Sequence, residues 1–203
     1  IWILHRHGRC FQRLKMKQKQ LLFQQTSKIH QMIKASTMTG QGLALDFEGN
    51  LKSGIREIGI VSFINFEISY AKEFIVNESI DLNNILENIP TDGFIISHNV
   101  MIEKNLIIKT FPYPTFPKGG TLQWGPWLDT VKIYQKLYPN LASYDLKNLV
   151  AQFLNEDGLS KLASKYCNLE KRKQHHALFD AICSFMLTER LVNQIDLGSF
   201  LEE

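Results

Sequence analysis

Two carboxylates, Asp46 and Glu48, stand one residue apart at the end of an apolar stretch that begins at Gly42. Alternate residues of a β-strand point to the same face, so both side chains would project together from the end of a central strand. Adjacent carboxylates repel each other, and a bound divalent cation is the usual partner that makes their burial tolerable. The alternative is an exposed strand end with two solvated acids, which is the commoner origin of an Asp-x-Glu tripeptide. Other residues of the chain must decide between these two interpretations.

Three further groups are of the types that metal-dependent acid–base chemistry uses. Glu103 lies five residues after His98, on a helix expected to continue to about residue 109. Asp180 lies within the last expected helix, and His175 precedes it by five residues, next to His176. Each of these alone is typical of a solvated helix surface. Together with the first pair, they supply four carboxylates and a histidine.

The elements that must position these groups follow an α/β pattern. The run at residues 93–97 is almost wholly apolar, as expected of a strand buried on both faces. The sequence predicts strands at residues 42–46, 57–66, 68–76 and 93–97, and helices at residues 81–87, 98–109, 127–137, 143–153, 158–166 and 175–194. Aromatic residues crowd residues 111–127, where they would either stack on nucleic-acid bases or pack this loop onto the core.

Residues 1–40 differ from the rest of the chain in charge. They carry eight Lys or Arg residues and no acid, whereas all 20 acidic residues lie in residues 41–203. Apolar spacings of three, four and seven predict a helix over residues 10–35. This basic N-terminal extension could pack on the domain or a missing neighbour, bind nucleic acid, or be a mitochondrial transit peptide. It would also be the connection to a partner or a preceding domain.

The composition argues against a membrane-spanning, a disulfide-rich or a zinc-binding protein. A hydrophobic content of 44% supports a packed core, and no apolar run is long enough to span a membrane. The three cysteines include no Cys-x-x-Cys pair, so they predict neither a disulfide framework nor a zinc site. A reducing compartment is the simpler interpretation, and we expect an intracellular, cytoplasmic protein.

In chain order, the motifs resemble those of the DEDDh-type 3′-5′ exonuclease family within the ribonuclease H-like superfamily, which includes the proofreading subunit of bacterial DNA polymerase III and RNase T. The resemblance covers about residues 42–195. No single motif is decisive, whereas all of them in one order are specific. The matching stretches are Asp46-Phe47-Glu48, Arg56-Glu57-Ile58-Gly59-Ile60-Val61, His98-Asn99 with Glu103, Asp129-Thr130, residues 139–149, and His175 with Ala177, Asp180 and Ala181.

The resemblance implies a ribonuclease H-like α/β fold, with a central mixed five-stranded sheet flanked by helices, in an exonuclease domain at residues 41–203. It implies a phosphodiester hydrolase that acts at the 3′ ends of single-stranded or frayed DNA or RNA. Two Mg²⁺ or Mn²⁺ ions would be held by Asp46, Glu48, Glu103 and Asp180. The products would be nucleoside 5′-monophosphates, and the role would lie in DNA repair or RNA processing.

Further roles follow from the same resemblance. His175 would take the proton from the attacking water, a task that suits imidazole near neutral pH. His176 is the alternative base, and the family's spacing of five residues before Asp180 favours His175. Residues beside the motifs would seat the 3′ end of the nucleic acid; these are Phe47, Gly49, His98 and Asn99. The basic residues 171–173 would meet the incoming phosphates or form a solvated turn.

The chain departs from the family pattern at two places. Glu103 stands where the family has Asp, and Gly49-Asn50 replaces Thr-Thr or Thr-Gly. A Glu supplies the same carboxylate on a longer side chain, which could reach the metal or shift the second ion and lower the rate. The alternative function is therefore a catalytically weak, exonuclease-like module that binds nucleic acid or a partner.

Overall fold

The computed structural model of the chain describes residues 40–76, 93–110 and 125–202. The expected helices at residues 10–35 and 81–87 and most of the aromatic loop lie outside these residues, as does nearly all of the basic extension. The strands are β1 (Gln41–Asn50), β2 (Gly54–Ile64), β3 (Glu67–Ile75), β4 (Phe94–Ser97), β5 (Trp127–Asp129) and β6 (Leu201–Glu202). The helices are α3 (Val100–Thr110), α4 (Thr130–Leu137), α5 (Leu146–Phe153), α6 (Glu156–Tyr166) and α7 (Ala177–Glu189), with 3₁₀ turns η1 (Leu169–Lys171) and η2 (Leu197–Phe200).

The strands form one mixed sheet in the order β3-β2-β1-β4-β5-β6. The pairs β1–β2, β2–β3 and β5–β6 are antiparallel, whereas β1–β4 and β4–β5 are parallel. The α/β fold with a mixed central sheet is therefore confirmed. The sheet has six strands because the two-residue β6 extends it beside β5, and strands this short carry no periodic signal in a sequence.

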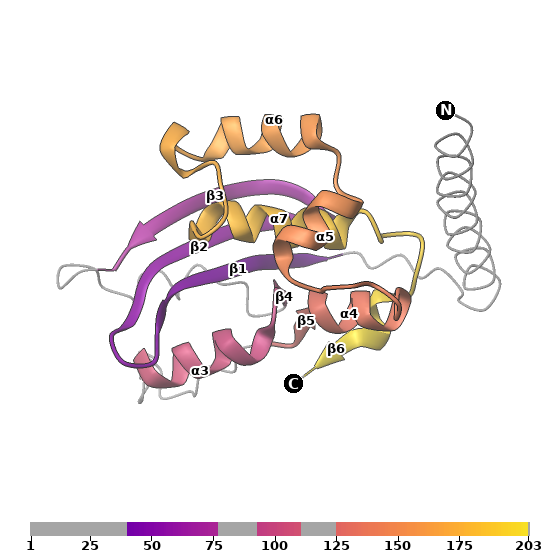
Figure 1. The fold of residues 1–203 in the computed structure, drawn as a ribbon, viewed down its shortest axis with the longest axis horizontal. Helices are drawn as coiled ribbons and strands as arrows, with labels where there is room; N and C mark the ends of the chain where they lie inside the picture. The colour runs from indigo at the N-terminus through magenta and orange to yellow at the C-terminus, as the bar shows by residue number, and fades with distance from the viewer. Residues whose placement is uncertain (1–39, 77–92, 111–124, 203) are drawn as a thin grey trace, which may run out of the picture.

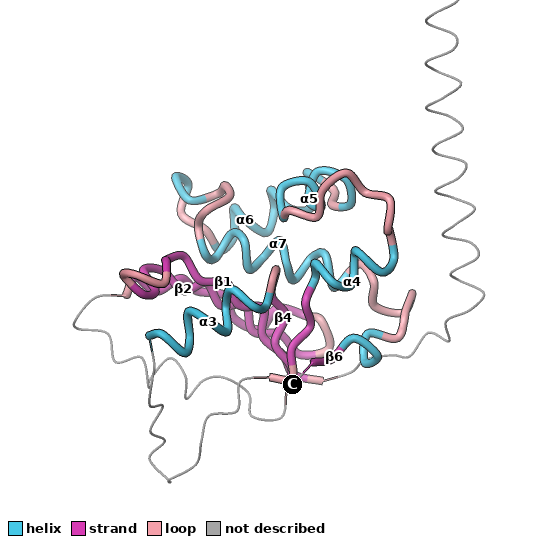
Figure 2. The backbone as a smooth tube through the Cα atoms, turned by 60° about the horizontal axis from the view of Figure 1, so that its bottom comes forward, coloured by secondary structure: helices cyan, strands magenta, loops and turns pink. Residues whose placement is uncertain are grey.

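Helices cover both faces of the sheet (Figures 1 and 2). The apolar residues of β1 alternate between the two sides: Leu43 and Leu45 pack in a cluster with Leu106 of α3, whereas Ala44 packs in a cluster with Ile182 of α7. Since alternate residues share a face, the next two positions on the α7 side are Asp46 and Glu48. The hydrophobic pattern of β1 thus places both carboxylates on the face of the sheet that α7 covers.

Several predicted helix boundaries differ from the structure, and those of α7 and α4 bear on the site. Helix α7 begins at Ala177 and ends at Glu189, so it is shorter at both ends than the predicted 175–194. It begins after His175 because that residue has a φ of 65°, in the left-handed region that a right-handed helix cannot include. Residues 127–129 form strand β5 rather than the first turn of a helix, and α4 starts at Thr130.

None of the helices in the described ranges is both long and apolar enough to cross a membrane.

Candidate metal centre

Strand β1 carries Asp46 and Glu48 beyond the end of its parallel neighbour. β4 pairs with β1 only over Gly42 to Ala44, while β2 continues to pair with β1 as far as Asn50. Asp46 is buried and Glu48 is half-buried. The two carboxylates therefore stand on an edge of β1 that β4 no longer covers, which leaves room for a third carboxylate from another element.

Glu103 supplies that third carboxylate from the first turn of α3, and its side chain is buried. It accepts a hydrogen bond from the backbone of Phe47, on the stretch of β1 past the end of β4. A buried backbone N–H needs a partner, and here a side chain takes the place of a neighbouring strand. This contact places the Glu103 carboxylate against the first motif, although the residue is one methylene longer than the Asp of the resembled family.

Asp180 comes from α7, and a glycine on β2 permits the approach. Gly59 pairs with Asp46 across the β1–β2 ladder. A Cβ atom at position 59 would lie 2.1 Å from the carbonyl carbon and oxygen of Ala177 and 2.3 Å from the Leu178 nitrogen. The first turn of α7 therefore rests on bare strand backbone, and Asp180, one turn later, is buried beside Asp46.

Asp129, from the Asp-Thr pair of the sequence, positions the starts of two helices. Its carboxylate accepts hydrogen bonds from the backbone N–H groups of Asn99 (3.1 Å), Val100 (3.2 Å) and Val131 (2.9 Å). These groups open α3 and α4, whose first N–H groups have no partner inside their own helices. Since Glu103 lies in the first turn of α3, Asp129 fixes the turn that presents Glu103 to the site.

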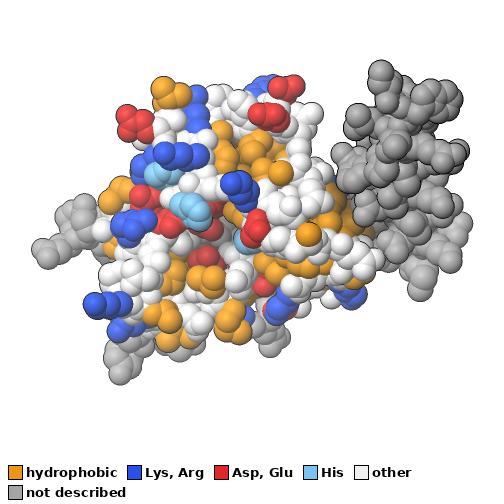
Figure 3. Space-filling model, viewed as in Figure 1, with side chains coloured by type: hydrophobic (Ala, Val, Ile, Leu, Met, Phe, Trp, Pro, Cys, Tyr) orange, Lys and Arg blue, Asp and Glu red, His pale blue; other side chains and the backbone are white. Residues whose placement is uncertain are grey.

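We call Asp46, Glu48, Glu103, Asp180 and His175 the central cluster. Ligand atoms of Glu48, His175 and Asp180 all lie within 4.8 Å of one another. Asp46 and Glu103 fall outside that three-residue group but interact with it electrostatically. Acidic and histidine side chains gather in the middle of the face shown in Figure 3, with Lys and Arg side chains around them. The structure thus places all five predicted residues in one region.

Burial and mutual repulsion act on three of these carboxylates. Burial, with the charges of Glu103, Asp180 and Glu48, raises the pKa of Asp46 well above its ordinary value. Burial also raises the pKa of Glu103, against the opposing effect of the Phe47 hydrogen bond. The pKa of Asp180 rises to about 6, again chiefly through burial, although the His175 amide opposes the shift. The protein therefore makes it unfavourable for all the carboxylates to be ionised without a positive partner.

The donor atoms of the central cluster fit a divalent cation. Carboxylate oxygens are the ligands that Mg²⁺ and Mn²⁺ prefer. Two of these oxygens, Glu103 Oε2 and Asp180 Oδ1, are buried and have no hydrogen-bond partner among the described residues. The ion pair that borders the cluster, Arg56 Nη2 to Glu48 Oε2, is 3.7 Å long and exposed, so it compensates little of the buried charge.

The two adjacent histidines face different carboxylates. His175 is exposed and shares its three-residue group with Glu48 and Asp180, and its backbone N–H donates to Asp180 Oδ2 at 2.9 Å. His176 instead lies with Glu57, its Nδ1 being 3.7 Å from Glu57 Oε2. The separation follows from the left-handed backbone at His175, which turns consecutive side chains apart. This arrangement favours His175 as the residue that faces the centre.

The residues expected to seat a substrate lie in different environments. Phe47 is buried in the core on the α3 side, and Gly49 is at a β-bulge where a Cβ would lie 2.3 Å from the Gly54 carbonyl oxygen. The His98 ring is partly buried, with Nδ1 2.8 Å from Thr130 Oγ1, and burial lowers its pKa. Asn99 is exposed with a φ of 66°. Their contacts with nucleic acid stay predictions.

Trp127 and Gly59 both take part in close packing in the structure. Trp127 is fully buried in the core, as the packing alternative for the aromatic loop predicts for this residue. Gly59 was matched only as part of a motif, although an isolated glycine inside a β-branched strand is itself a signal of close backbone approach. The carboxylates Glu57 and Glu73 were not singled out, because their proximity depends on strand register.

No protein-family model matches the chain, and no curated protein is similar to it in sequence. Among solved structures, the chain is similar to one described as "Exonuclease X in complex with 5′ overhanging duplex DNA". The two share 16% sequence identity, and the match covers 79% of this chain and 96% of that chain, with a TM-score of 0.44. The functional proposal therefore rests on the geometry of the central cluster and on the motifs of the sequence.

Proposed function

We propose that this protein is a metal-dependent nuclease that hydrolyses phosphodiester bonds, acting as a 3′-5′ exonuclease on single-stranded or frayed DNA or RNA. The observation that supports it is the convergence of four carboxylates from three elements beside an exposed histidine, where two of the carboxylates have a buried oxygen without a hydrogen-bond partner in the described part of the chain. The order of the motifs supports the direction of attack and the release of nucleoside 5′-monophosphates. Nucleic-acid 3′ ends are the corresponding partners.

The central cluster would hold the metal ions through Asp46, Glu48, Glu103 and Asp180. Divalent cations bound there would stabilise negative charge on the scissile phosphate and favour ionisation of the attacking water. The raised pKa values of the buried carboxylates show that their ionised forms are unfavourable without a cation, and a bound divalent cation would stabilise those forms. We propose two Mg²⁺ or Mn²⁺ ions, the number that four carboxylates and the resembled motifs support.

His175 would accept the proton of the attacking water. Its backbone is fixed to Asp180, and its imidazole is exposed at the rim of the cluster, where water and substrate have access. His176 is turned toward Glu57 and lies in a different group of charged residues. Replacing His175 with Gln should therefore lower kcat by about 10²- to 10⁴-fold, the usual contribution of a positioned base. A dead His176→Gln variant beside an active His175→Gln variant would overturn this assignment.

The direct experiment uses a 5′-labelled single-stranded DNA and the RNA of the same sequence, with Mg²⁺, Mn²⁺ or EDTA. We expect a ladder of products shortened from the 3′ end, lost with EDTA and in the Asp46→Ala variant. The same substrate labelled at its 3′ end should release a labelled mononucleotide at once. A ladder that persists in Asp46→Ala would show a contaminating nuclease and contradict the proposal.

A catalytically weak binding module is the second candidate, and Glu103 is the observation that favours it. Binding of the oligonucleotide without shortening in either metal would support this candidate. The Glu103→Asp variant tests the cause, because it restores the residue of the resembled family. A large gain of activity in Glu103→Asp would show that the longer side chain limits the rate, whereas a loss would show that this site is built around Glu.

A further inference from the structure

A second group of charged side chains lies directly beside the central cluster. Glu57 pairs with Glu48 across the β1–β2 ladder, so the two carboxylates are cross-strand neighbours. Ligand atoms of Glu57, Glu73 and His176 lie within 4.8 Å of one another. Lys171 Nζ lies 3.4 Å from Glu57 Oε1 and also contacts Glu73 Oε2. We call Glu57, Glu73, Lys171 and His176 the clasp.

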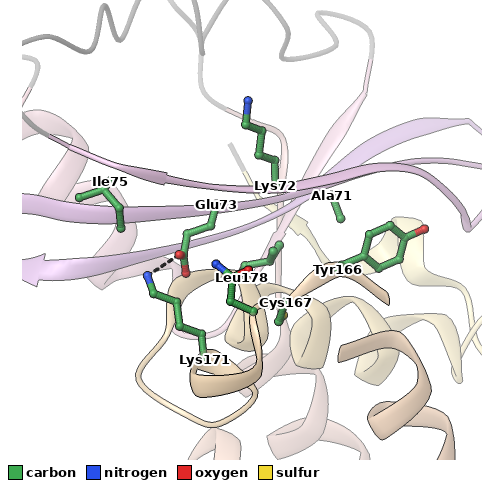
Figure 4. Close-up of a pocket in the computed structure, with 9 residues that line it drawn as sticks. Ala71, Lys72, Glu73, Ile75, Tyr166, Cys167, Lys171 and Leu178 are labelled. Carbon is green, nitrogen blue, oxygen red and sulfur yellow. Dashed lines mark hydrogen bonds and ion pairs between the residues drawn. The ribbon is translucent and has the colours of Figure 1, made fainter. Parts of the chain in front are cut away.

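The clasp contains its own cation. Figure 4 shows the Lys171 side chain reaching the Glu73 carboxylate at the wall of a pocket of about 440 Å³. The two carboxylates and the histidine resemble a metal-ligand set, but the ammonium group of Lys171 already supplies the positive charge that they need. Burial alone would lower the pKa of Lys171, yet its contacts with Glu73 and Glu57 raise it. Lys171 therefore offsets part of the negative charge of the clasp inside the protein.

The clasp joins both ends of the segment that presents His175. Lys171 ends η1, and His176 is the residue that caps the start of α7. Between them, residues 172–175 form bends without helix or strand. Both flanking side chains, Lys171 and His176, approach the same Glu57 carboxylate. Glu57 of β2 thus lies beside both ends of residues 172–175, which we call the arc that carries His175.

The backbone of the arc needs such support. His175 has a left-handed φ of 65°, a conformation that a residue with a Cβ atom adopts only when its surroundings hold it. Its N–H bond to Asp180 holds the arc on the α7 side. On the α6 side, Arg172 donates from Nε to the Cys167 carbonyl and from Nη2 to the Ser164 carbonyl. Lys171 links this segment to the sheet.

We propose that Lys171, through Glu57 and Glu73, is a positioning residue that holds His175 over the central cluster. The inference rests on the function proposed above. A displacement of a reacting group by about 1 Å lowers a rate by about 10²-fold, so loss of the clasp should affect kcat rather than substrate binding. A Lys171 that contacts substrate phosphates would give the opposite pattern, with a raised KM that depends on salt.

Lys171→Met is the variant of choice, because methionine keeps an unbranched apolar chain and removes the charge. Lys171→Arg keeps the charge, and Lys161→Met removes an exposed charge from the neighbouring helix α6. With 5′-labelled single-stranded DNA in Mg²⁺, Lys171→Met should lower kcat about 10- to 100-fold with KM within about twofold of the parent. Lys171→Arg should recover at least part of the loss, and Lys161→Met should leave kcat unchanged.

A readout independent of activity completes the test. Hydrogen exchange of residues 172–176 should become faster in Lys171→Met and stay unchanged in Lys161→Met, since the clasp holds that segment. If Lys171→Met does not fold, Glu73→Gln replaces it, with the same expected loss of kcat and faster exchange. Unchanged exchange in the variant that folds would overturn the proposal.

The kinetic outcomes separate this inference from the proposed function. An active parent enzyme with an unchanged kcat in Lys171→Met, or with a rise in KM alone, would overturn the clasp and leave the nuclease proposal standing. A parent enzyme without nuclease activity in either metal would overturn both. A fall in kcat shared equally by Lys161→Met would mean that total positive charge matters, and it would also overturn the role of Lys171.

Discussion

The central cluster and the clasp are built from neighbouring residues, yet they compensate their charges differently. Glu48 and Glu57 are paired across one ladder, and His175 and His176 are consecutive. The clasp contains Lys171, which contacts both of its carboxylates. Among the described residues, the ion pair of the central cluster is the exposed, 3.7 Å contact of Arg56 with Glu48. The two groups therefore differ in that the clasp has a lysine between its two carboxylates, whereas the described part of the chain gives the central cluster no such internal cation.

The pKa shifts of the central cluster and of the clasp differ in the same way. The pKa values of Asp46, Glu103 and Asp180 are all raised, and burial is the largest cause in each. In the clasp, contacts with Glu73 and Glu57 raise the pKa of Lys171 and so stabilise its charged form. Without metal, ionisation of the central carboxylates thus works against folding, whereas the charges of the clasp favour folding. Substitutions at Asp46, Lys171 and Asp180 test this difference of sign.

The largest expected effect is on activity in Asp46→Asn. Metal ions supply several kcal/mol of charge stabilisation in such reactions, so loss of this carboxylate should lower kcat by about a thousandfold or more. The same substitution removes a buried charge that its neighbours repel, so the metal-free protein should melt at a higher temperature than the parent. A melting curve in EDTA and a nuclease assay in Mg²⁺ measure the two effects.

Lys171→Met is the matched control from the clasp. It leaves Glu57 and Glu73 largely buried without their positive partner, so it should lower the free energy of unfolding in EDTA by about 1–3 kcal/mol. A gain of stability in Asp46→Asn together with a loss of stability in Lys171→Met would sharpen the comparison. Destabilisation by both variants would break it, because the central cluster would then hold its charges as a satisfied network.

The second prediction concerns pH. The pKa of Asp180 is raised from 3.8 to about 6, so its neutral form favours the folded state. Its contribution is fully present below pH about 4 and is lost as the pH rises through about 6, a change of roughly 3 kcal/mol at 1.36 kcal/mol per unit. Through this carboxyl alone, the metal-free protein should therefore have a lower free energy of unfolding at pH 7.5 than at pH 5.

Denaturant unfolding in EDTA at several pH values measures this dependence. Mg²⁺ should restore stability at pH 7.5, because a cation favours the ionised carboxylates. Asp180→Asn should flatten the profile between pH 4 and 6. A profile that is identical in the parent and in Asp180→Asn would contradict the raised pKa and, with it, the charge imbalance of the central cluster.

The third prediction separates packing from charge. Gly59→Ala would place a Cβ 2.1 Å from the backbone of Ala177, so the start of α7 must shift. We expect a loss of about 1–3 kcal/mol in the free energy of unfolding and a lower kcat, since Asp180 and His175 both depend on this contact. Gly158→Ala in α6, where the nearest atom is 3.7 Å away, is the control and should be neutral or stabilising by up to about 1 kcal/mol.

The smallest expected effect is a new metal site. Removing the lysine in Lys171→Ala would leave Glu57, Glu73 and His176 without their internal cation, and three of their atoms, Glu57 Oε2, Glu73 Oε1 and His176 Nδ1, already have no hydrogen-bond partner among the described residues. Zn²⁺ should then raise the melting temperature of Lys171→Ala by a few degrees more than that of the parent. The gain should vanish in the double variant with His176→Ala, and a gain that persists would place the ion elsewhere.

Short spacings predicted the long strands, whereas the members of the central cluster were predicted from the order of motifs that resemble an exonuclease family. Asp46 and Glu48 share a face by strand geometry, and the motif around Asp180 lies on a helix with a clear apolar pattern. Strand β5 was missed because three residues cannot show a period. The clasp was missed because it depends on a register in which Glu57 faces Glu48, with a β-bulge after Glu48. Neither property is encoded in local spacing.

The contact at Gly59 also has a mechanical consequence. With strand backbone directly against the first turn of α7, this end of the helix has no free space in which to slide along the sheet. Displacement of α7 relative to β2 should therefore be a rotation about that contact, with an amplitude that grows toward Glu189. Asp180, one turn from the pivot, would move least, so the ligand geometry would be preserved while the far end of the helix fluctuates.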